Sequence, residues 1–321
     1  MKTTLTKRLV TGAAISLCLG VSTQALALGA VAYSWLELDI FQAFNNDTGN
    51  QLDVTDFSFL DVGNSSSSSG TSSFGGGVAN ASPSTLDTTL ACSSGGSCAA
   101  IAENDPTQQA VTNFGRGDTD GDGAVISGLP VNNFVNVWTV AEGRQNTVGD
   151  TQGQSGARTT TEFTFALDTT TEVRFDFEAM SELFVQLEQP QIQAQASYSW
   201  VLTIVDIDAG DLEVFNWSPD GGGADPNCTG SVSGCQTLAE AFSLNDARGQ
   251  LSTGQNGTGV QNGFFSSVAT FGGGVNYRFT IGHQSQINTQ VAAVPEPAML
   301  FLLGAGLAGF GVTRRLGKAK A

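Results

Sequence analysis

The sequence is poor in histidine and lysine, which narrows the chemistry that the chain can perform. His283 is the single histidine, and no lysine occurs between residues 28 and 293. A Ser-His-Asp triad would have to use His283, and no serine lies in a Gly-x-Ser-x-Gly motif. His283 lies just beyond the end of a predicted strand, where a surface position is expected. We therefore expect no catalytic role for this histidine and no enzymatic activity of the triad type.

Basic residues of any kind are scarce in the same region. Residues 28–293 contain six arginines and 29 of the 30 acidic residues, which leaves a formal charge of −23. A surface of this charge repels nucleic acid and anionic lipid, and it attracts divalent cations. Nucleic acid is therefore excluded as a partner.

The two ends of the chain contain the apolar runs that the middle lacks. Near the N-terminus, three basic residues precede an apolar run over 9–21, and Ala25-Leu26-Ala27 has the small-x-small pattern of a cleavage site. This order is typical of a secretory signal peptide. We expect a signal peptide over 1–27, a secreted body over 28–293 and a tail over 294–321.

The tail has three parts in a fixed order. Val294-Pro295-Glu296-Pro297 contains two prolines, which favour an extended and accessible segment. An apolar run over 298–312 follows, and then Arg314 and Arg315 with two lysines. Fifteen helical residues reach about 22 Å, which is less than a hydrocarbon core of about 30 Å. The run predicts a single transmembrane helix that is shorter than a usual anchor. The basic residues after it predict that this end lies in the cytoplasm, with the body outside.

This tail resembles a PEP-CTERM sorting tail, on the strength of Val294-Pro295-Glu296-Pro297, the Gly-rich apolar run and the Arg314-Arg315 cluster. The resemblance implies recognition by an exosortase, a membrane-embedded transpeptidase-like enzyme of exopolysaccharide-producing Gram-negative bacteria. It implies transient contact with the inner membrane, removal of the tail, and release or transfer of the body to the cell surface. It covers less than a tenth of the chain and concerns sorting rather than the activity of the body. An ordinary C-terminal anchor is the alternative.

Four of the five cysteines lie in the body and form two pairs that are close in sequence. Cys92 and Cys98 bracket one Gly/Ser-rich segment, and Cys228 and Cys235 bracket another. In an exported protein this spacing predicts two local disulfides. A zinc site made of all four thiolates is the alternative.

Alternation of apolar and polar residues predicts β-strands through most of the body. Val173, Phe175 and Phe177 alternate with charged residues, and the same period recurs over 275–281. A hairpin loop is predicted at 168–171. Further strands are predicted at 32–44, 54–60, 131–140, 161–167, 182–187, 198–206, 212–217 and 264–271.

About ten strands with Gly/Ser/Asn-rich loops predict an all-β fold, an antiparallel β-sandwich of the jelly-roll type. One large sandwich and two smaller ones both fit the length. A helix is predicted only over 236–244. The Ser-rich stretch 63–77 is predicted to be a mobile loop, because it has little apolar area to bury.

One acidic motif predicts a metal site. Asp118, Asp120 and Asp122 occupy positions 1, 3 and 5 of a calcium loop, and Gly123 occupies position 6. Position 12 would be Leu129, so the bidentate carboxylate of an EF-hand is missing. We expect a calcium-binding turn completed by groups from elsewhere, with a plain acidic turn as the alternative.

The sorting tail, the acidic body and the polar loops together predict an exported surface or extracellular-matrix (biofilm) protein. Its expected role is structural or carbohydrate-interacting, with exopolysaccharide as a partner and no cofactor besides calcium. The alternatives are a lectin-like binding module and an extracellular polysaccharide hydrolase. A glycosidase needs two carboxylates about 5 to 9.5 Å apart, for which Glu178, Glu182 and Glu188 are the first candidates. The expectation for these three residues is that they lie on polar faces of strands.

Overall fold

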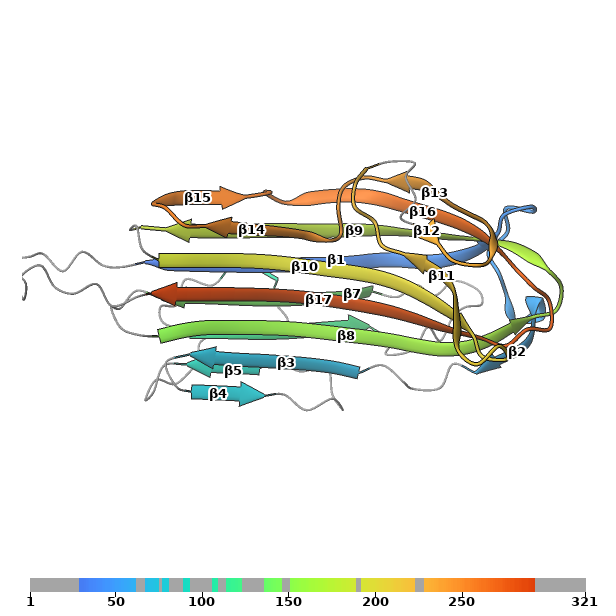
Figure 1. Cartoon of the computed structure of the whole chain (residues 1–321), viewed down its shortest axis with the longest axis horizontal. Coiled ribbons are helices and arrows are strands. Elements are labelled where there is room, and N and C mark those ends of the chain that lie inside the picture. The colour runs from blue at the N-terminus through green and yellow to red at the C-terminus, as the bar shows by residue number, and fades with distance from the viewer. Residues whose placement is uncertain are drawn as a thin grey trace, which may run out of the picture.

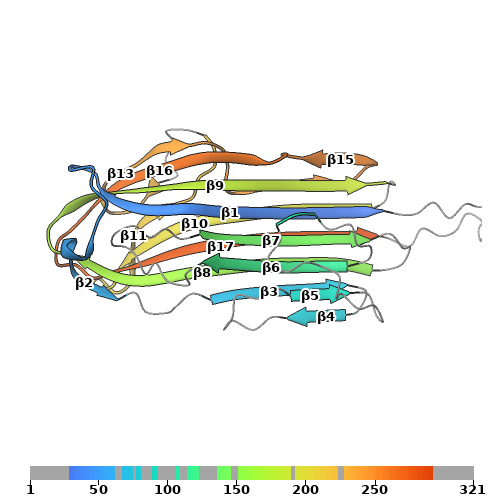
Figure 2. The ribbon, with the colours of Figure 1, turned by 180° about the vertical axis from the view of Figure 1, so that it is seen from behind.

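The computed structural model describes residues 29–61, 67–74, 77–80, 89–92, 106–108, 114–122, 136–145, 151–188, 192–222 and 228–291. In these ranges the protein is all-β, as predicted, and its strands form two antiparallel sheets that pack face to face (Figures 1 and 2). The described part includes one 3-10 turn, Val54–Asp56, whose first amides are capped by Asp53. Within the described ranges, no helix is both long and apolar enough to cross a membrane.

The first sheet, called sheet A, has strand β1 near its centre. Its order is β13 (Ser233–Glu240), β16 (Gln261–Phe271), β9 (Thr171–Leu187), β1 (Ala30–Asn45), β7 (Asn136–Gln145), β6 (Phe114–Asp122) and β5 (Thr89–Cys92). The short strand β15 (Gly254–Gly257) also pairs with β9. Neighbours in this sheet come from distant parts of the sequence, since Ala30 of β1 pairs with Leu187 of β9.

The second sheet, sheet B, has β17 at its centre. Its order is β12 (Cys228–Thr229), β11 (Leu212–Trp217), β10 (Ile192–Asp206), β17 (Tyr277–Val291), β8 (Thr151–Leu167), β3 (Ser67–Phe74) and β4 (Gly77–Asn80). In addition, β14 (Asp246–Gln250) pairs with β10, and β2 (Phe57–Asp61) pairs with β8. Each sheet therefore mixes strands from both halves of the chain.

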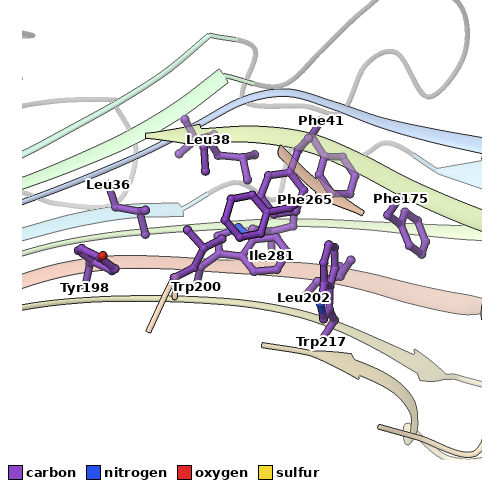
Figure 3. Packing of buried hydrophobic residues seen from close by; sticks show 14 of the residues in the cluster. Leu36, Leu38, Phe41, Phe175, Tyr198, Trp200, Leu202, Trp217, Phe265 and Ile281 are labelled. Carbon is purple, nitrogen blue, oxygen red and sulfur yellow. The ribbon is translucent and has the colours of Figure 1, made fainter. Parts of the chain in front are cut away.

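One half of the core between the sheets is aromatic. Inward positions alternate along each strand, so Phe175 and Phe177 of β9 are both buried. Trp200 of β10 packs on Phe177 with ring centroids 4.8 Å apart. Trp200 also meets Trp217 of β11 nearly at right angles at 5.5 Å, and both tryptophans are labelled in Figure 3. Each fully buried side chain of this size contributes about 1.5–3 kcal/mol. These rings belong to the buried hydrophobic cluster between the two sheets.

In the other half of the core, toward the beginning of β1 and the end of β17, most inward positions of β1, β10 and β17 are small or polar, while β9 contributes Leu183, Val185 and Leu187. The Cα atoms of β1 come within 8 Å of those of β10 and β17, closer than the usual sheet separation of about 10 Å. Such an approach requires short side chains between the sheets. The inward positions here carry Ala30, Ala32, Ser34, Ala194, Ala196 and Ser285, all of them buried.

Because the sheets are so close here, side chains of one sheet reach the backbone of the other. Ser34 Oγ donates a hydrogen bond of 2.7 Å to the carbonyl oxygen of Ser197. In the opposite direction, Ser285 Oγ donates to the carbonyl oxygen of Thr139 at 3.1 Å. These bonds hold the two layers together where the facing positions of β1 and β10 are mostly alanine and serine.

Several strands are longer than the apolar pattern predicts. The pattern ends the last strand at Ile281, whereas β17 continues to Val291. The alternation is hidden because the inward residues His283, Ser285 and Thr289 are polar yet buried. The predicted surface position of His283 is therefore wrong. Likewise, β9 joins two predicted strands, since its inward residue Ser181 interrupts the apolar period.

The turn at 168–170 exists, but the predicted hairpin is wrong. Strand β8, before the turn, belongs to sheet B, and β9, after it, belongs to sheet A. Phe165 of β8 and Phe175 of β9 both join the same core cluster. The chain crosses between layers here, because the two apolar faces are buried against each other rather than side by side in one sheet.

Two further local predictions are wrong. Residues 236–244 form no helix, because β13 runs to Glu240 and pairs with β16, so tertiary pairing overrides local propensity. Within 63–77, Ser67–Phe74 forms β3, which pairs with β8. Backbone hydrogen bonds of a sheet require no apolar side chain, so a Ser-rich segment can complete the ladder.

Candidate functional site

The sorting tail begins close to the folded body. Strand β17 ends at Val291, and two alanines separate it from Val294. Strands β9 and β17 both end at the same end of the sandwich (Figures 1 and 2), and β1 begins there because Ala30 pairs with Leu187. The motif residues Val294 to Pro297, Arg314 and Arg315 lie outside the described residues, as does the predicted helix over 298–312.

The aspartates of the predicted calcium turn lie in a strand. Asp118, Asp120 and Asp122 belong to β6 and pair with β7, so the expected turn is wrong at these positions. Alternate residues of a strand are about 6.6 Å apart, so the backbone does not wrap around one ion as a calcium loop does. Among the described residues, no group of three His, Cys, Asp or Glu side chains is placed to hold a metal. Calcium binding stays a prediction, since the side chains of Asp120 and Asp122 are outside the described set.

Asp118 belongs instead to a buried ionic cluster on the outer side of sheet A. Its carboxylate lies 3.9 Å from Arg116 Nη1, and Arg116 Nη2 lies 3.6 Å from the carboxylate of Glu142. Arg144 approaches Glu142 at 3.5 Å, and Arg116 also donates to the carbonyl oxygen of Thr107 at 3.2 Å. Removing one partner of such a cluster would leave a buried charge uncompensated. The arrangement gives Asp118 a positive neighbour within the protein.

The cysteine prediction is confirmed for one pair. Cys228 and Cys235 form a disulfide, with Cα atoms 5.7 Å apart. Cys228 lies in β12 of sheet B and Cys235 in β13 of sheet A, so the bond joins the edges of the two layers. Gly230, between them, has φ of +140°, and a Cβ there would lie 2.0 Å from the Val214 carbonyl oxygen, so only glycine fits this turn. Cys92 ends β5, and its predicted partner Cys98 is outside the described residues.

The three glutamates considered for glycoside hydrolysis do not form a catalytic pair with one another. Glu178 and Glu182 point to the same side of β9 but are four residues apart, about 13 Å along a strand. Glu188 follows the end of that strand and lies against Gly29. Burial raises the pKa of Glu182 above its usual value. A retaining or inverting glycosidase needs its carboxylates within about 9.5 Å, which none of these pairs meets along the strand.

His283 lies between the sheets, where it has a structural role. Its Nε2 is 2.8 Å from the carbonyl oxygen of Leu36 on β1, and its ring is buried. Among the described residues, Nδ1 has no hydrogen-bond partner. Burial lowers the pKa of His283 to about 4, while the bond to Leu36 partly opposes that shift. The side chain is therefore neutral near pH 7.

A polar groove on the outer face of sheet B is the best candidate for a binding site in the described body. It has a volume of about 340 Å³ and lies where β14 runs beside β10, next to β17. That volume is at the lower end of the range for small-ligand sites, about 300 Å³ and above. Its walls are formed by Ser197, Tyr198, Ser199, Asn245, Asp246, Ala247, Gln284 and Gln286.

The strand register sets the chemistry of this groove. Ser199 of β10 pairs with Gln284 of β17, and Ser197 pairs with Gln286, so two hydroxyls and two amides lie side by side. The same face continues with Gln195 opposite Asn288 and Gln193 opposite Gln290. Among the described residues, the side chains of Ser197, Ser199, Gln284 and Gln286 form no hydrogen bond. Their donors and acceptors are therefore available to a ligand.

This groove could not be found from apolar periodicity, because the periodicity ends at Ile281 in one predicted strand and begins only at Tyr198 in the other. A signal was nevertheless present in the sequence. Gln193 and Gln195 alternate with buried alanines, and Gln284, Gln286, Asn288 and Gln290 recur at every second position. A period of two in amide residues indicates one polar face of a strand.

The described body is thus an all-β, two-sheet protein with a C-terminal extension that begins just after its last strand. A family model for the PEP-CTERM protein-sorting motif matches residues 293–315. The chain therefore carries this motif, consistent with an exosortase substrate, a secreted protein sorted through its C-terminal tail to the bacterial cell surface. Neither curated proteins nor solved structures gave a match to the chain.

Proposed function

We propose that this protein is a non-catalytic component of the extracellular matrix, structural or carbohydrate-interacting, which reaches the cell surface through its tail. The observation that carries the proposal is the sorting motif at 293–315, which directly follows the last strand of the sandwich. The strongly acidic composition of the body supports a soluble, exposed location. Pairing of the strands over nearly the whole described length supports a rigid body.

Carbohydrate interaction is supported by the groove on sheet B. Its free side chains are neutral hydroxyls and amides, which can both donate and accept hydrogen bonds, as sugar hydroxyls do. Its one carboxylate, Asp246, is paired with Arg248 at 2.7 Å. This lining supports a binding role more than the alternative of a polysaccharide hydrolase, which needs two carboxylates facing a substrate.

Finer features belong to the same proposal. They are a jelly-roll connection of the sandwich, a short transmembrane helix over 298–312 held briefly in the inner membrane of a Gram-negative bacterium, and exopolysaccharide as a partner. A Cys92–Cys98 disulfide and bound calcium complete the set.

The sorting part is tested in the producing cells with Pro295→Ala combined with Pro297→Ala. These changes remove the extended segment before the apolar run, so the unprocessed precursor should accumulate in the membrane fraction. Pro83→Ala combined with Pro190→Ala, which removes two prolines distant from the tail in the sequence, should leave processing unchanged. Immunoblots of membrane, surface and medium fractions give the result. Normal processing of the tail variant would contradict recognition through this segment.

The matrix part is tested by fractionation and by deletion of the gene. The protein should sediment with the extracellular polysaccharide of the native culture, and cells that lack it should form a weaker or thinner matrix. A matrix of unchanged mass and adhesion, with the protein free in the medium, would refute the matrix role.

A further inference from the structure

Charge is distributed unevenly between the central strands of the two outer faces of the sandwich. On sheet A, the outward positions of β9 carry Glu172, Arg174, Asp176, Glu178 and Glu182. On sheet B, the outward positions of β10 from Gln193 to Val205 and of β17 from Thr280 to Gln290 carry no charged side chain. A body with 29 acidic residues thus has two adjacent central strands whose outer face is neutral.

The neutral strip has a regular geometry. Its amides and hydroxyls repeat about every 6.6 Å along each strand, and the two strands lie about 4.8 Å apart. The groove lies on this strip where β14 continues the sheet beside β10. Ala247 of β14 lies opposite Ser197, so the groove is bounded by short side chains on that side and by Gln284 and Gln286 on the other.

The charges next to the groove restrict the ligand. Asp246 accepts a hydrogen bond from the Ala247 amide at 2.7 Å in addition to its pairing with Arg248. Arg158 of β8, which pairs with Gln284 in register, is exposed at the rim. One rim cation does not balance the field of the acidic body, so a polyanion would be repelled on approach. A polycation would be drawn to the acidic face of sheet A instead.

We infer that the groove formed by Ser197, Ser199, Gln284 and Gln286 binds a neutral polysaccharide, whose chain lies along β10 and β17. This inference rests on the proposed function and gives it a site and a ligand class. Tyr198 is buried beneath the groove and its hydroxyl already bonds to Ser181, so the described residues that line the groove offer no exposed aromatic ring for stacking. Binding therefore depends on hydrogen bonds and should be weak per site.

The test uses affinity electrophoresis of the secreted protein recovered from the producing cells. The gels contain hydroxyethylcellulose, dextran or galactomannan as neutral probes, and alginate as the acidic probe. Gln286→Glu places a charge in the groove, and Gln186→Glu places the same charge on β9 of sheet A as the control. At least one neutral probe should retard the native protein and the control equally, and the groove variant should bind about tenfold more weakly. Gln286→Ala should lose about fivefold without a change of charge.

Each other result is decisive. Equal binding by the groove variant and the control would refute the site while leaving a carbohydrate-binding role intact. Retardation by alginate alone would refute the neutral ligand class. No retardation by any probe would refute both the site and the carbohydrate-interacting form of the proposed function. Concentration-dependent dimerisation that Gln286→Glu abolishes, measured by sedimentation without any polysaccharide, would assign the strip to a second copy of the chain and overturn the inference.

Discussion

The side-chain amide of Asn245 takes the place of a strand beside Trp200. Asn245 Oδ1 accepts from the Trp200 amide at 3.1 Å, and Asn245 Nδ2 donates to the Trp200 carbonyl oxygen at 3.1 Å. On this edge, β10 pairs with β14 up to Tyr198 and with β11 from Leu202. Trp200 falls between the two partners, so a side chain completes the ladder.

We predict that Asn245→Ala lowers the free energy of unfolding by about 1 to 2 kcal/mol, because it leaves two backbone groups of Trp200 without protein partners. Asn245→Asp should also destabilise, since a carboxylate cannot donate to the carbonyl oxygen. Urea denaturation followed by tryptophan fluorescence measures the effect. Asn256→Ala is the control, because Asn256 makes a surface bond to Gly249 and should cost less than about 0.5 kcal/mol. Equal losses in Asn245→Ala and Asn256→Ala would contradict this role.

His283 should make stability depend on pH. Its folded pKa of about 4 lies below the usual value of 6.5 for histidine, so between pH 4 and 6.5 the unfolded state binds the proton more readily than the folded state. The contribution of His283 to the free energy of unfolding is fully present above pH 6.5 and is lost as pH falls toward 4. It amounts to about 3 kcal/mol at most.

The measurement is the free energy of unfolding against pH for the native protein and His283→Gln. Titration of the carboxylates is common to both proteins and cancels in the difference. The native protein should lose more stability than the variant between pH 6.5 and 4. Parallel curves would show that the histidine is not the group responsible.

The Cys228–Cys235 disulfide should contribute about 2 kcal/mol, because it closes a loop of seven residues between the edges of the two sheets. Replacing both cysteines with serine should lower the urea midpoint by a corresponding amount. Peptide mapping without reductant should recover Cys228 joined to Cys235 in the native protein. A cross-link from either residue to Cys92 or Cys98 would contradict the assignment.

Calcium is predicted to bind weakly near Asp120, with a dissociation constant of about 10⁻⁴ to 10⁻³ M, because the motif lacks its final carboxylate. Millimolar calcium should then raise the melting temperature relative to chelator. Asp120→Ala should lose this rise, while Asp168→Ala, in the exposed turn before β9, should keep it. If both variants respond like the native protein, calcium acts elsewhere or only screens charge.

The features that the sequence determined by itself depend on residues close together along the chain. The sorting tail is such a feature, because Pro295, Pro297 and the arginines are recognised in order without a fold. The Cys228–Cys235 bond is another, since a short Gly-containing loop brings the two thiols together. The all-β class followed from alternation in runs such as Val173 to Phe177, where large apolar residues mark every inward position.

Tertiary structure alone decided which strands are neighbours, and with that the burial of His283 and the place of the groove. Pairing in an antiparallel sheet joins residues far apart in sequence, such as Ser197 and Gln286, and the backbone hydrogen bonds that form it carry no sequence signature. Where the two sheets approach closely, inward positions hold serine, alanine and histidine, so the apolar period disappears although the strand continues. The turn after Leu167 is a further example. The local pattern predicts that the chain reverses there, but β9 joins the other sheet because β8 and β9 bury their apolar faces in a shared core.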